Sequence, residues 1–186
     1  NLLEDSEKYK IKKYIQQSIA LLYGEHGQEI VNETVPLNPA SFIQSAFDME
    51  EMVRASNLNW CILRGGSFYG IGTNREDEWR KSAKQGKLII PKDGNDLISL
   101  IHVADMAQAI VCAIQNAPSQ SIYNIVDDEP VSYKVLFNYI TSQLNLPAPQ
   151  TGGAQYLFSL GCDNSKAKRE LQWKPFYASY VSGLAQ

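Results

Sequence analysis

The side chains best suited to bind a metal or attack a substrate are two histidines and three cysteines. They are scattered along 186 residues and show no spacing typical of metal ligands, so we expect no metal site. The cysteines are odd in number and lie in or beside apolar stretches, which favours buried free thiols at Cys61, Cys112 and Cys162. Free thiols are typical of a reducing compartment, so we expect a cytoplasmic protein.

A phenol and an ammonium group one helical turn apart can exchange a proton with a substrate, because the positive charge lowers the phenol pKa toward working pH. This arrangement requires a tyrosine four residues before a lysine. The only such pair in the chain is Tyr9 with Lys13. It precedes the body of the first predicted strand, so we interpret it as a chance match.

The elements that must position any site alternate between strand-like and helix-like stretches, which predicts an α/β fold with a largely parallel sheet. Strands are predicted at 12–18, 59–63, 87–90, 97–103 and 121–126. Helices are predicted at 1–8, 40–56, 74–84, 104–116, 133–144, 164–171 and 177–184. Loops are predicted at 19–38 and 147–153. Ser132 is the predicted cap of the helix that follows it.

Two helices show an apolar face at helical spacing. The first predicted face comprises Phe42, Ala46, Met49 and Val53. The second comprises Met106, Ala109, Ile110 and Ala113. We expect both faces to pack against the sheet.

Composition and net charge indicate a globular protein and argue against nucleic-acid and membrane partners. Hydrophobic residues make up 44% and charged residues 20%, which suits one globular domain. The net charge of −3 provides no field that attracts nucleic acid, and no apolar run is long enough to span a bilayer. We therefore expect neither a nucleic-acid nor a membrane partner. Residues 1–4 read like the middle of a helix, so we also expect a segment upstream.

Six blocks of sequence occur in an order and at a spacing that match a known protein family. They are Tyr14–Ser18 with Leu22–Gly24, Glu33–Pro39, Ile62–Gly70, Ile101–Ala107, Tyr123–Ser132 and Asn164–Pro175. Together these blocks cover nearly the whole chain. They resemble the NAD-dependent epimerase/dehydratase family, also called the extended short-chain dehydrogenase/reductases.

The resemblance implies the second half of a Rossmann-type parallel sheet with a small C-terminal substrate-binding subdomain, the N-terminal βαβ units being missing from this chain. Residues 1–70 would complete the dinucleotide-binding domain, 71–97 would form an excursion into the substrate subdomain, 98–130 would return to the sheet, and 131–186 would form the subdomain. The implied cofactor is NAD or NADP. The glycine-rich turn that seats its pyrophosphate is absent, so most of the cofactor site would lie upstream.

The family's chemistry uses a tyrosine, a lysine four residues later, and a serine or threonine on a neighbouring loop. Aligned on Pro39, the tyrosine position holds Phe42 and the lysine position holds Ala46. The hydroxyl position, counted from Tyr23-Gly24, holds Ile19, and Ser18 is one residue earlier. Phenylalanine, alanine and isoleucine offer neither a proton nor a charge. The resemblance therefore implies a degenerate catalytic motif with no catalytic residue at these positions.

Other positions keep the family pattern. The resemblance implies that cofactor-binding residues are Ser18, Arg64, Gly65, Gly66 and Ser67, and that substrate-binding residues are Tyr23, Tyr69 and His102. A tight turn explains the two glycines equally well, and a structural hydrogen bond is the favoured interpretation of His102. Members that act on nucleotide sugars often carry an arginine four residues before the His-Val pair, and this position holds Ile98.

Two functions follow from the resemblance. The first is an NAD(P)-dependent epimerase or dehydratase that acts on a nucleotide sugar or another carbonyl or hydroxyl substrate, with the Tyr-x-x-x-Lys motif lost. The second is a non-catalytic dinucleotide sensor or assembly subunit on the same scaffold. Under either function we expect a small-molecule ligand and a homodimer formed through the 40–56 helix.

Overall fold

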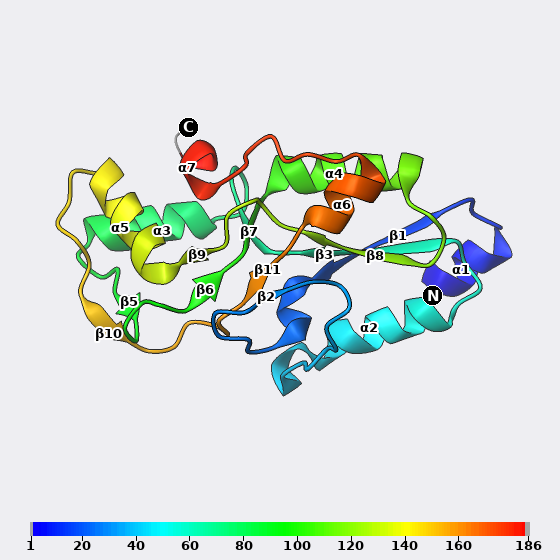
Figure 1. Ribbon diagram of the computed structural model, residues 1–186, viewed down its shortest axis with the longest axis horizontal. Coiled ribbons are helices and arrows are strands. Elements are labelled where there is room, and N and C mark those ends of the chain that lie inside the picture. The colour runs from blue at the N-terminus through cyan, green and yellow to red at the C-terminus, as the bar shows by residue number, and fades with distance from the viewer. Residues whose placement is uncertain (1, 185–186) are drawn as a thin grey trace.

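The computed structural model describes residues 2–184. Its centre is a parallel sheet of three strands in the order β1-β3-β8 (Figure 1). These strands are β1 (Tyr14–Ile19), β3 (Trp60–Gly65) and β8 (Ser121–Ile125). All six residues of β3 are buried, as expected of an apolar central strand covered on both faces. The predicted α/β fold with a parallel sheet is confirmed.

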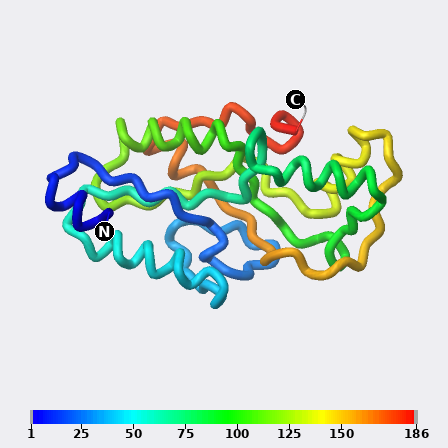
Figure 2. Tube along the Cα trace, turned by 180° about the vertical axis from the view of Figure 1, so that it is seen from behind, coloured from blue at the N-terminus to red at the C-terminus, as the bar shows by residue number. Residues whose placement is uncertain are grey.

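Helices cover both faces of this sheet, as Figures 1 and 2 show from opposite sides. The helix α2 (Gln44–Ala55) lies on one face, and α4 (Val103–Asn116) with α6 (Ser165–Leu171) lies on the other. A parallel sheet needs such crossovers, because each strand must return to the same end before the next begins. The short helix α1 (Leu2–Lys8) precedes β1.

The apolar face predicted for the 40–56 helix is wrong at its first residue. The segment begins as a 3₁₀ turn, η2 (Ser41–Ile43), and only then becomes α2. A 3₁₀ turn advances the chain by a third of a circle per residue, which shifts the phase. Phe42 is therefore 65% exposed, and Ile43 is buried in its place. Further along α2, Glu50 is buried with Val53.

The apolar face of α4 follows the prediction. Met106, Ala109 and Ala113 are buried against the sheet, and Ile110 packs beside them. The amino group of Lys13 donates to the carbonyls of Ala113 and Ala117 at the end of this helix. A lysine at a helix C-terminus satisfies carbonyls that have no partner within the helix.

A second apolar core lies at the opposite end from α1 and is built by α3 (Arg75–Lys84) and α5 (Tyr133–Gln143). The rings of Trp79 and Phe137 meet edge to face at 6.0 Å between centroids. The hydroxyl of Ser132 accepts from the Val135 backbone, so the predicted cap is confirmed. The short helix α7 (Tyr180–Gly183) contributes buried Tyr180 to this core.

Short strand pairs lie outside the central three-stranded sheet. They are β4 (Ser67–Tyr69) with β7 (Leu100–His102), β6 (Leu97–Ile98) with β9 (Val131–Ser132), β5 (Ile90–Pro91) with β10 (Thr151–Gly153), and β2 (Ile30–Val31) with β11 (Gly161–Cys162). The predicted 87–90 strand is thus reduced to residues 90–91. The predicted 147–153 loop ends in a strand, because its backbone pairs with β5. Likewise, the predicted 19–38 loop contains β2.

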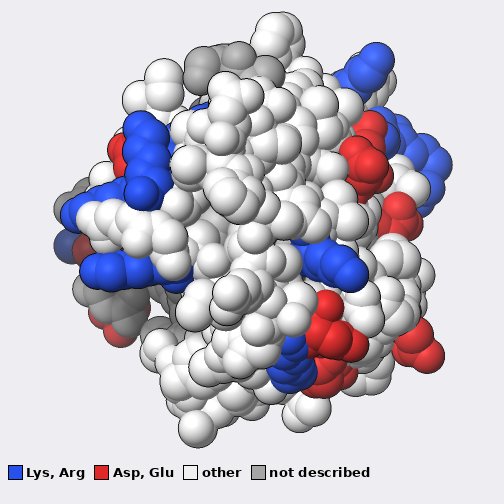
Figure 3. All heavy atoms as spheres, turned by 90° about the vertical axis from the view of Figure 1, so that its left-hand side faces the viewer, with Lys and Arg blue, Asp and Glu red and all other residues white. Residues whose placement is uncertain are grey.

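The face drawn in Figure 3 carries both basic and acidic side chains, and neither kind covers it alone. Uncharged side chains cover most of that face, and both signs of charge occur on it. No helix within residues 2–184 is both long and apolar enough to cross a bilayer. Of the three free cysteines, Cys61 and Cys162 are buried, and Cys112 is half-buried.

Candidate functional site

A cavity of about 190 Å³ opens beyond the carboxyl ends of two neighbouring strands. Ile19 ends β1 and Gly65 ends β3, and the parallel register sets these two residues opposite one another. Both line the cavity, together with Ala20 and Leu21 of the short turn η1 (Ala20–Tyr23). Open parallel sheets bind their ligands at this edge, because the loops that follow the strands diverge there.

A glycine turn forms the floor of the cavity between β3 and β4. A methyl group on Gly66 would lie 2.6 Å from the carbonyl oxygen of Ser99, so only glycine fits this approach of two backbones. The Ser67 backbone donates to the same Ser99 carbonyl at 2.8 Å. The tight-turn interpretation thus accounts for Gly66. Ser67 is half-buried and lines the cavity, where its hydroxyl can meet a ligand.

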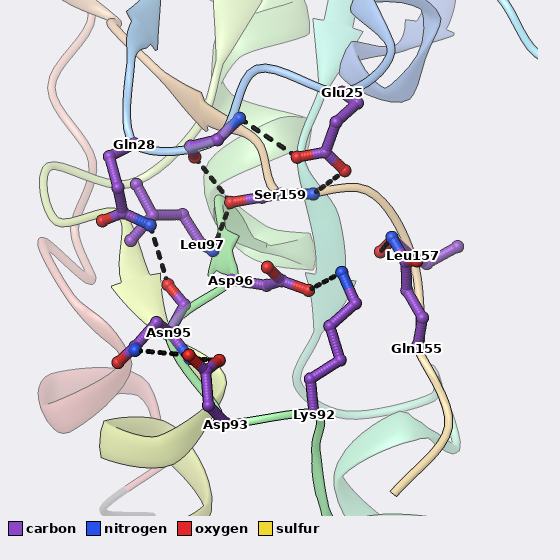
Figure 4. Close-up of polar contacts among 11 residues, drawn as sticks. Glu25, Gln28, Lys92, Asp93, Asn95, Asp96, Leu97, Gln155, Leu157 and Ser159 are labelled. Carbon is purple, nitrogen blue, oxygen red and sulfur yellow. Dashed lines mark hydrogen bonds and ion pairs between the residues drawn. The ribbon is translucent and has the colours of Figure 1, made fainter. Parts of the chain in front are cut away.

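The opposite wall is a loop that carries Leu157, Phe158 and Leu160. Figure 4 shows how Ser159 fastens this loop to its surroundings. Its backbone N–H donates to Glu25 at 3.0 Å. Its hydroxyl donates to the Gly27 carbonyl and accepts from the Leu97 backbone N–H at 2.9 Å. Because one residue ties the loop to two other segments, the apolar wall is held in a fixed place.

Two polar groups approach the cavity from the N-termini of α3 and α5. Among residues 2–184, Arg75 is the only charged residue that lines it, and Tyr133 also lines it, with 1% of its surface exposed. Burial raises the pKa of Tyr133, and the charge of Arg75 opposes that effect only in part. The phenol therefore keeps its proton at neutral pH and serves as a hydrogen-bond donor rather than as an acid–base catalyst.

Of the three positions that the family resemblance assigns to catalysis, Ile19 and Phe42 lie at or beside this cavity. Ile19 lines it. The ring of Phe42 lies 6.2 Å from that of Phe158, which forms part of the wall. Ala46 is half-buried one turn further along α2. Ser18 is buried, its hydroxyl makes no hydrogen bond within residues 2–184, and it does not line the cavity.

The sequence placed Arg64 at the cofactor and Tyr23 at the substrate, and the structure buries both in the core. Arg64 donates to Glu50 through Nε at 3.0 Å and through Nη2 at 2.7 Å, and its Nη1 donates to the Tyr23 hydroxyl at 2.9 Å. That hydroxyl donates onward to Asn124 at 2.8 Å. Burial raises the pKa of Tyr23 to about 12, so this phenol is a structural group.

Tyr69 and His102 also lie away from the cavity that holds the glycine turn. Tyr69 is fully buried, which raises its pKa. His102 caps α4, since its Nδ1 accepts from the Ala104 backbone at 3.2 Å, which agrees with the favoured structural interpretation. Its ring borders a separate cavity of about 250 Å³, beside Glu76 and Asp77. Residues 2–184 contain no group of three or more histidine, cysteine or acidic side chains placed to hold a metal.

Sequence reasoning missed Arg75 and Tyr133 as site residues. Both are the first residue of a helix, and each follows a polar residue, Asn74 or Ser132. A helix that starts at the carboxyl edge of a sheet directs its first side chains toward that edge, which is the one signal that could have identified them. Nothing in the local sequence shows that the two helices converge.

Comparison with known proteins gives a consistent picture. The sequence model of the NAD dependent epimerase/dehydratase family matches residues 1–126. The chain is 27% identical to a 3-diazoavenalumate denitrifying reductase of a Streptomyces species, covering all of the chain and 68% of the reductase. It is 27% identical to a UDP-glucose 4-epimerase of Lacticaseibacillus casei, covering 95% of the chain and 62% of the epimerase.

A solved structure shares the fold. The dTDP-glucose 4,6-dehydratase of Bacillus anthracis in complex with NAD superposes with a TM-score of 0.87 at 23% identity, covering 98% of this chain and 62% of the dehydratase. The chain thus spans about two thirds of the length of these proteins. Because the family match extends over more than half of the chain, the prediction made from the six sequence blocks is confirmed. The chain belongs to the NAD-dependent epimerase/dehydratase family.

Proposed function

We propose that this chain forms the nicotinamide-facing and substrate-binding part of an NAD(P)-linked redox protein that lacks the family's tyrosine proton donor. The observation that carries the proposal is the pairing of Ile19 with Gly65 at the carboxyl edge of the sheet, where both line one cavity. Relatives of the same fold include an NAD complex. When bound, the nicotinamide supplies or accepts a hydride.

The residues present fit the nicotinamide end of a dinucleotide. Ile19, Ala20 and Leu21 give an apolar surface against a flat ring, and Ser67 offers a hydroxyl to a carboxamide. These side chains would orient the ring and exclude water from it, which favours hydride transfer over hydrolytic side reactions. The chain contains no glycine-rich turn that would bind the pyrophosphate.

The first test compares ligands that carry the nicotinamide end of the cofactor with a ligand that carries only the adenosine end. We expect NADH and reduced nicotinamide mononucleotide to stabilise the purified protein in a thermal-shift titration, whereas AMP has no effect. The expected gain is about 2–3 kcal/mol when a ligand reaches roughly a hundredfold of its Kd. Stabilisation by AMP equal to that by NADH would contradict the assignment of the nicotinamide end. So would the absence of any shift with both nicotinamide ligands.

The second candidate function is a dinucleotide sensor or assembly subunit without catalysis. It is favoured by the family positions themselves, since Phe42 and Ala46 carry no group that moves a proton. The two candidates differ in one measurable property. A redox protein turns over with NADH and a suitable acceptor, whereas a sensor binds the nucleotide and leaves it unchanged.

Restoring the family residues tests whether the site is merely silenced. We expect the Phe42→Tyr/Ala46→Lys variant to oxidise NADH with a small aldehyde about 10²-fold faster than the parent, because a positioned acid–base group contributes at least that factor. The matched control is Ser41→Tyr/Ser45→Lys, which places the same pair on exposed positions of the same segment. Equal rates in the two variants would show that Phe42 and Ala46 are not the catalytic positions.

A further inference from the structure

The cavity holds an arginine, Arg75, that has no acceptor among the described residues. Every other arginine within residues 2–184 pairs with a carboxylate, namely Arg54, Arg64, Arg80 and Arg169. The Arg75 side chain makes no hydrogen bond or ion pair within residues 2–184. Its guanidinium carbon lies 5.8 Å from the Trp79 ring centroid. The aromatic ring orients the planar group without neutralising its charge.

The same cavity holds a buried hydroxyl without a partner. Tyr133 is 1% exposed, and its hydroxyl makes no hydrogen bond within residues 2–184. Buried hydroxyls nearly always have a partner, because an unpaired one forfeits the hydrogen bond that water would give it. An acceptor on a bound ligand would satisfy this group.

The electrostatic surroundings favour an anion. No acidic residue of the described part of the chain, residues 2–184, lines the cavity. Asp96 is the carboxylate whose charge acts on the Tyr133 phenol, and it is paired with Lys92 at 3.0 Å. Arg75 and Tyr133 begin helices of 10 and 11 residues, so the positive ends of two helix dipoles point toward the same place.

The rest of the wall fixes the size and character of the ligand. Leu97, Ile98, Leu157 and Phe158 make it apolar. The cavity measures about 190 Å³. A void of about 150 Å³ accommodates benzene, whereas pockets for larger ligands span roughly 300–1,000 Å³. A single aromatic ring fits within this volume, whereas a nucleotide sugar with two phosphates exceeds it.

We propose that Arg75 and Tyr133 form a carboxylate anchor, and that the substrate is a small aromatic carboxylic acid whose ring occupies the apolar part of the cavity. The guanidinium forms a charge-assisted pair with the carboxylate, and the phenol donates to one of its oxygens. The anchor deepens the proposed function and rests on it, since it assigns the substrate of that site. In this proposal, recognition of the substrate lies at the helix N-termini, and hydride transfer lies at the strand ends near Gly65.

The test is calorimetric titration of the protein without any dinucleotide, using trans-cinnamate, neutral cinnamamide and UDP-glucose as probes. We expect cinnamate to bind at least tenfold more tightly than cinnamamide, and UDP-glucose to bind more weakly than cinnamate. Arg75→Gln should reduce cinnamate affinity roughly 10- to 100-fold and leave cinnamamide unaffected, because only the charged pair is lost. The matched control Lys81→Gln removes the same charge from the exposed side of α3 and should change neither.

Tyr133→Phe supplies an independent readout. It should weaken cinnamate binding about fivefold and, in the absence of ligand, raise the Tm, because the unpaired hydroxyl is removed. Equal binding of cinnamate and cinnamamide, no binding of cinnamate, or unchanged affinity in Arg75→Gln would each overturn the anchor. Tighter binding of UDP-glucose would assign the cavity to nucleotide sugars instead. Because no nicotinamide ligand is present, failure here is distinguishable from failure of the cofactor test.

Discussion

Replacing Glu50 with leucine should lower the free energy of unfolding by about 3–5 kcal/mol, because it leaves the Arg64 guanidinium buried without its counterion. Arg64 is 1% exposed and Glu50 is fully buried, and they form a bidentate pair at 3.0 and 2.7 Å. The guanidinium also donates to Tyr23, so the pair joins α2 to β3 and to the turn after β1. Urea unfolding monitored by circular dichroism measures the loss.

The compensated variant Glu50→Leu/Arg64→Met should recover most of this loss, because a buried ion pair and well-packed apolar side chains of similar volume contribute nearly equal stability. A control is available on the same carboxylate. Arg54 approaches Glu50 from the solvent side at 3.6 Å and its side chain is 37% exposed, so Arg54→Met should cost less than about 1 kcal/mol. A double variant as unstable as the single one would show that the pair itself, rather than an uncompensated charge, stabilises the fold.

This ion pair marks the limit of what the sequence could predict about the fold. The alternation of elements, the buried run of β3 and the inward face of α4 depend on local periodicity, and each agrees with the structure. Glu50 does not follow that logic. A glutamate on a helix is exposed by default, and only Arg64, which follows β3's apolar run, draws it inward. Local patterns carry no record of such a distant partner.

Some residues of the candidate site could likewise be predicted from the sequence, and others could not. The family resemblance predicted Gly65 and Gly66 at the cofactor and Ile19 at a catalytic position, and all three line the cavity. The family resemblance assigned Tyr23 to the substrate, yet its hydroxyl accepts from Arg64 and donates to Asn124. Arg75 and Tyr133 come together only because α3 and α5 pack against one another, and no local pattern reports that packing. The homodimer through the 40–56 helix and the four-part division of the chain stay predictions.

Stability should also fall as pH rises, and Asp127 is the expected cause. This carboxyl is 1% exposed, and its Oδ2 makes no hydrogen bond within residues 2–184. From the same described residues, its Oδ1 accepts only the Glu129 backbone N–H, at 3.3 Å. Burial, reinforced by the negative charges of Asp128, Glu129 and Asp105, raises the pKa of Asp127 to about 8.

The direction follows from comparing the two states. The unfolded carboxyl has a pKa near 3.9, so between about pH 4 and pH 8 the folded protein holds a proton that the unfolded chain has released. Each step up in pH through this window therefore favours unfolding. The stabilisation present below pH 4 is lost progressively and levels off above pH 8. The total loss attributable to Asp127 is up to about 5 kcal/mol.

Urea unfolding at a series of pH values from 5 to 9 measures this slope. Asp127→Asn keeps an acceptor for the Glu129 N–H but cannot ionise, so its curve should lose the decline seen in the parent and should lie above that of the parent at pH 9. Asp48→Asn removes an exposed carboxylate from α2 and should reproduce the parent slope. If the Asp127→Asn curve runs parallel to the parent curve, the pH dependence originates in another group. The Asp127 carboxylate would then be ionised in the folded protein as it is in the unfolded chain.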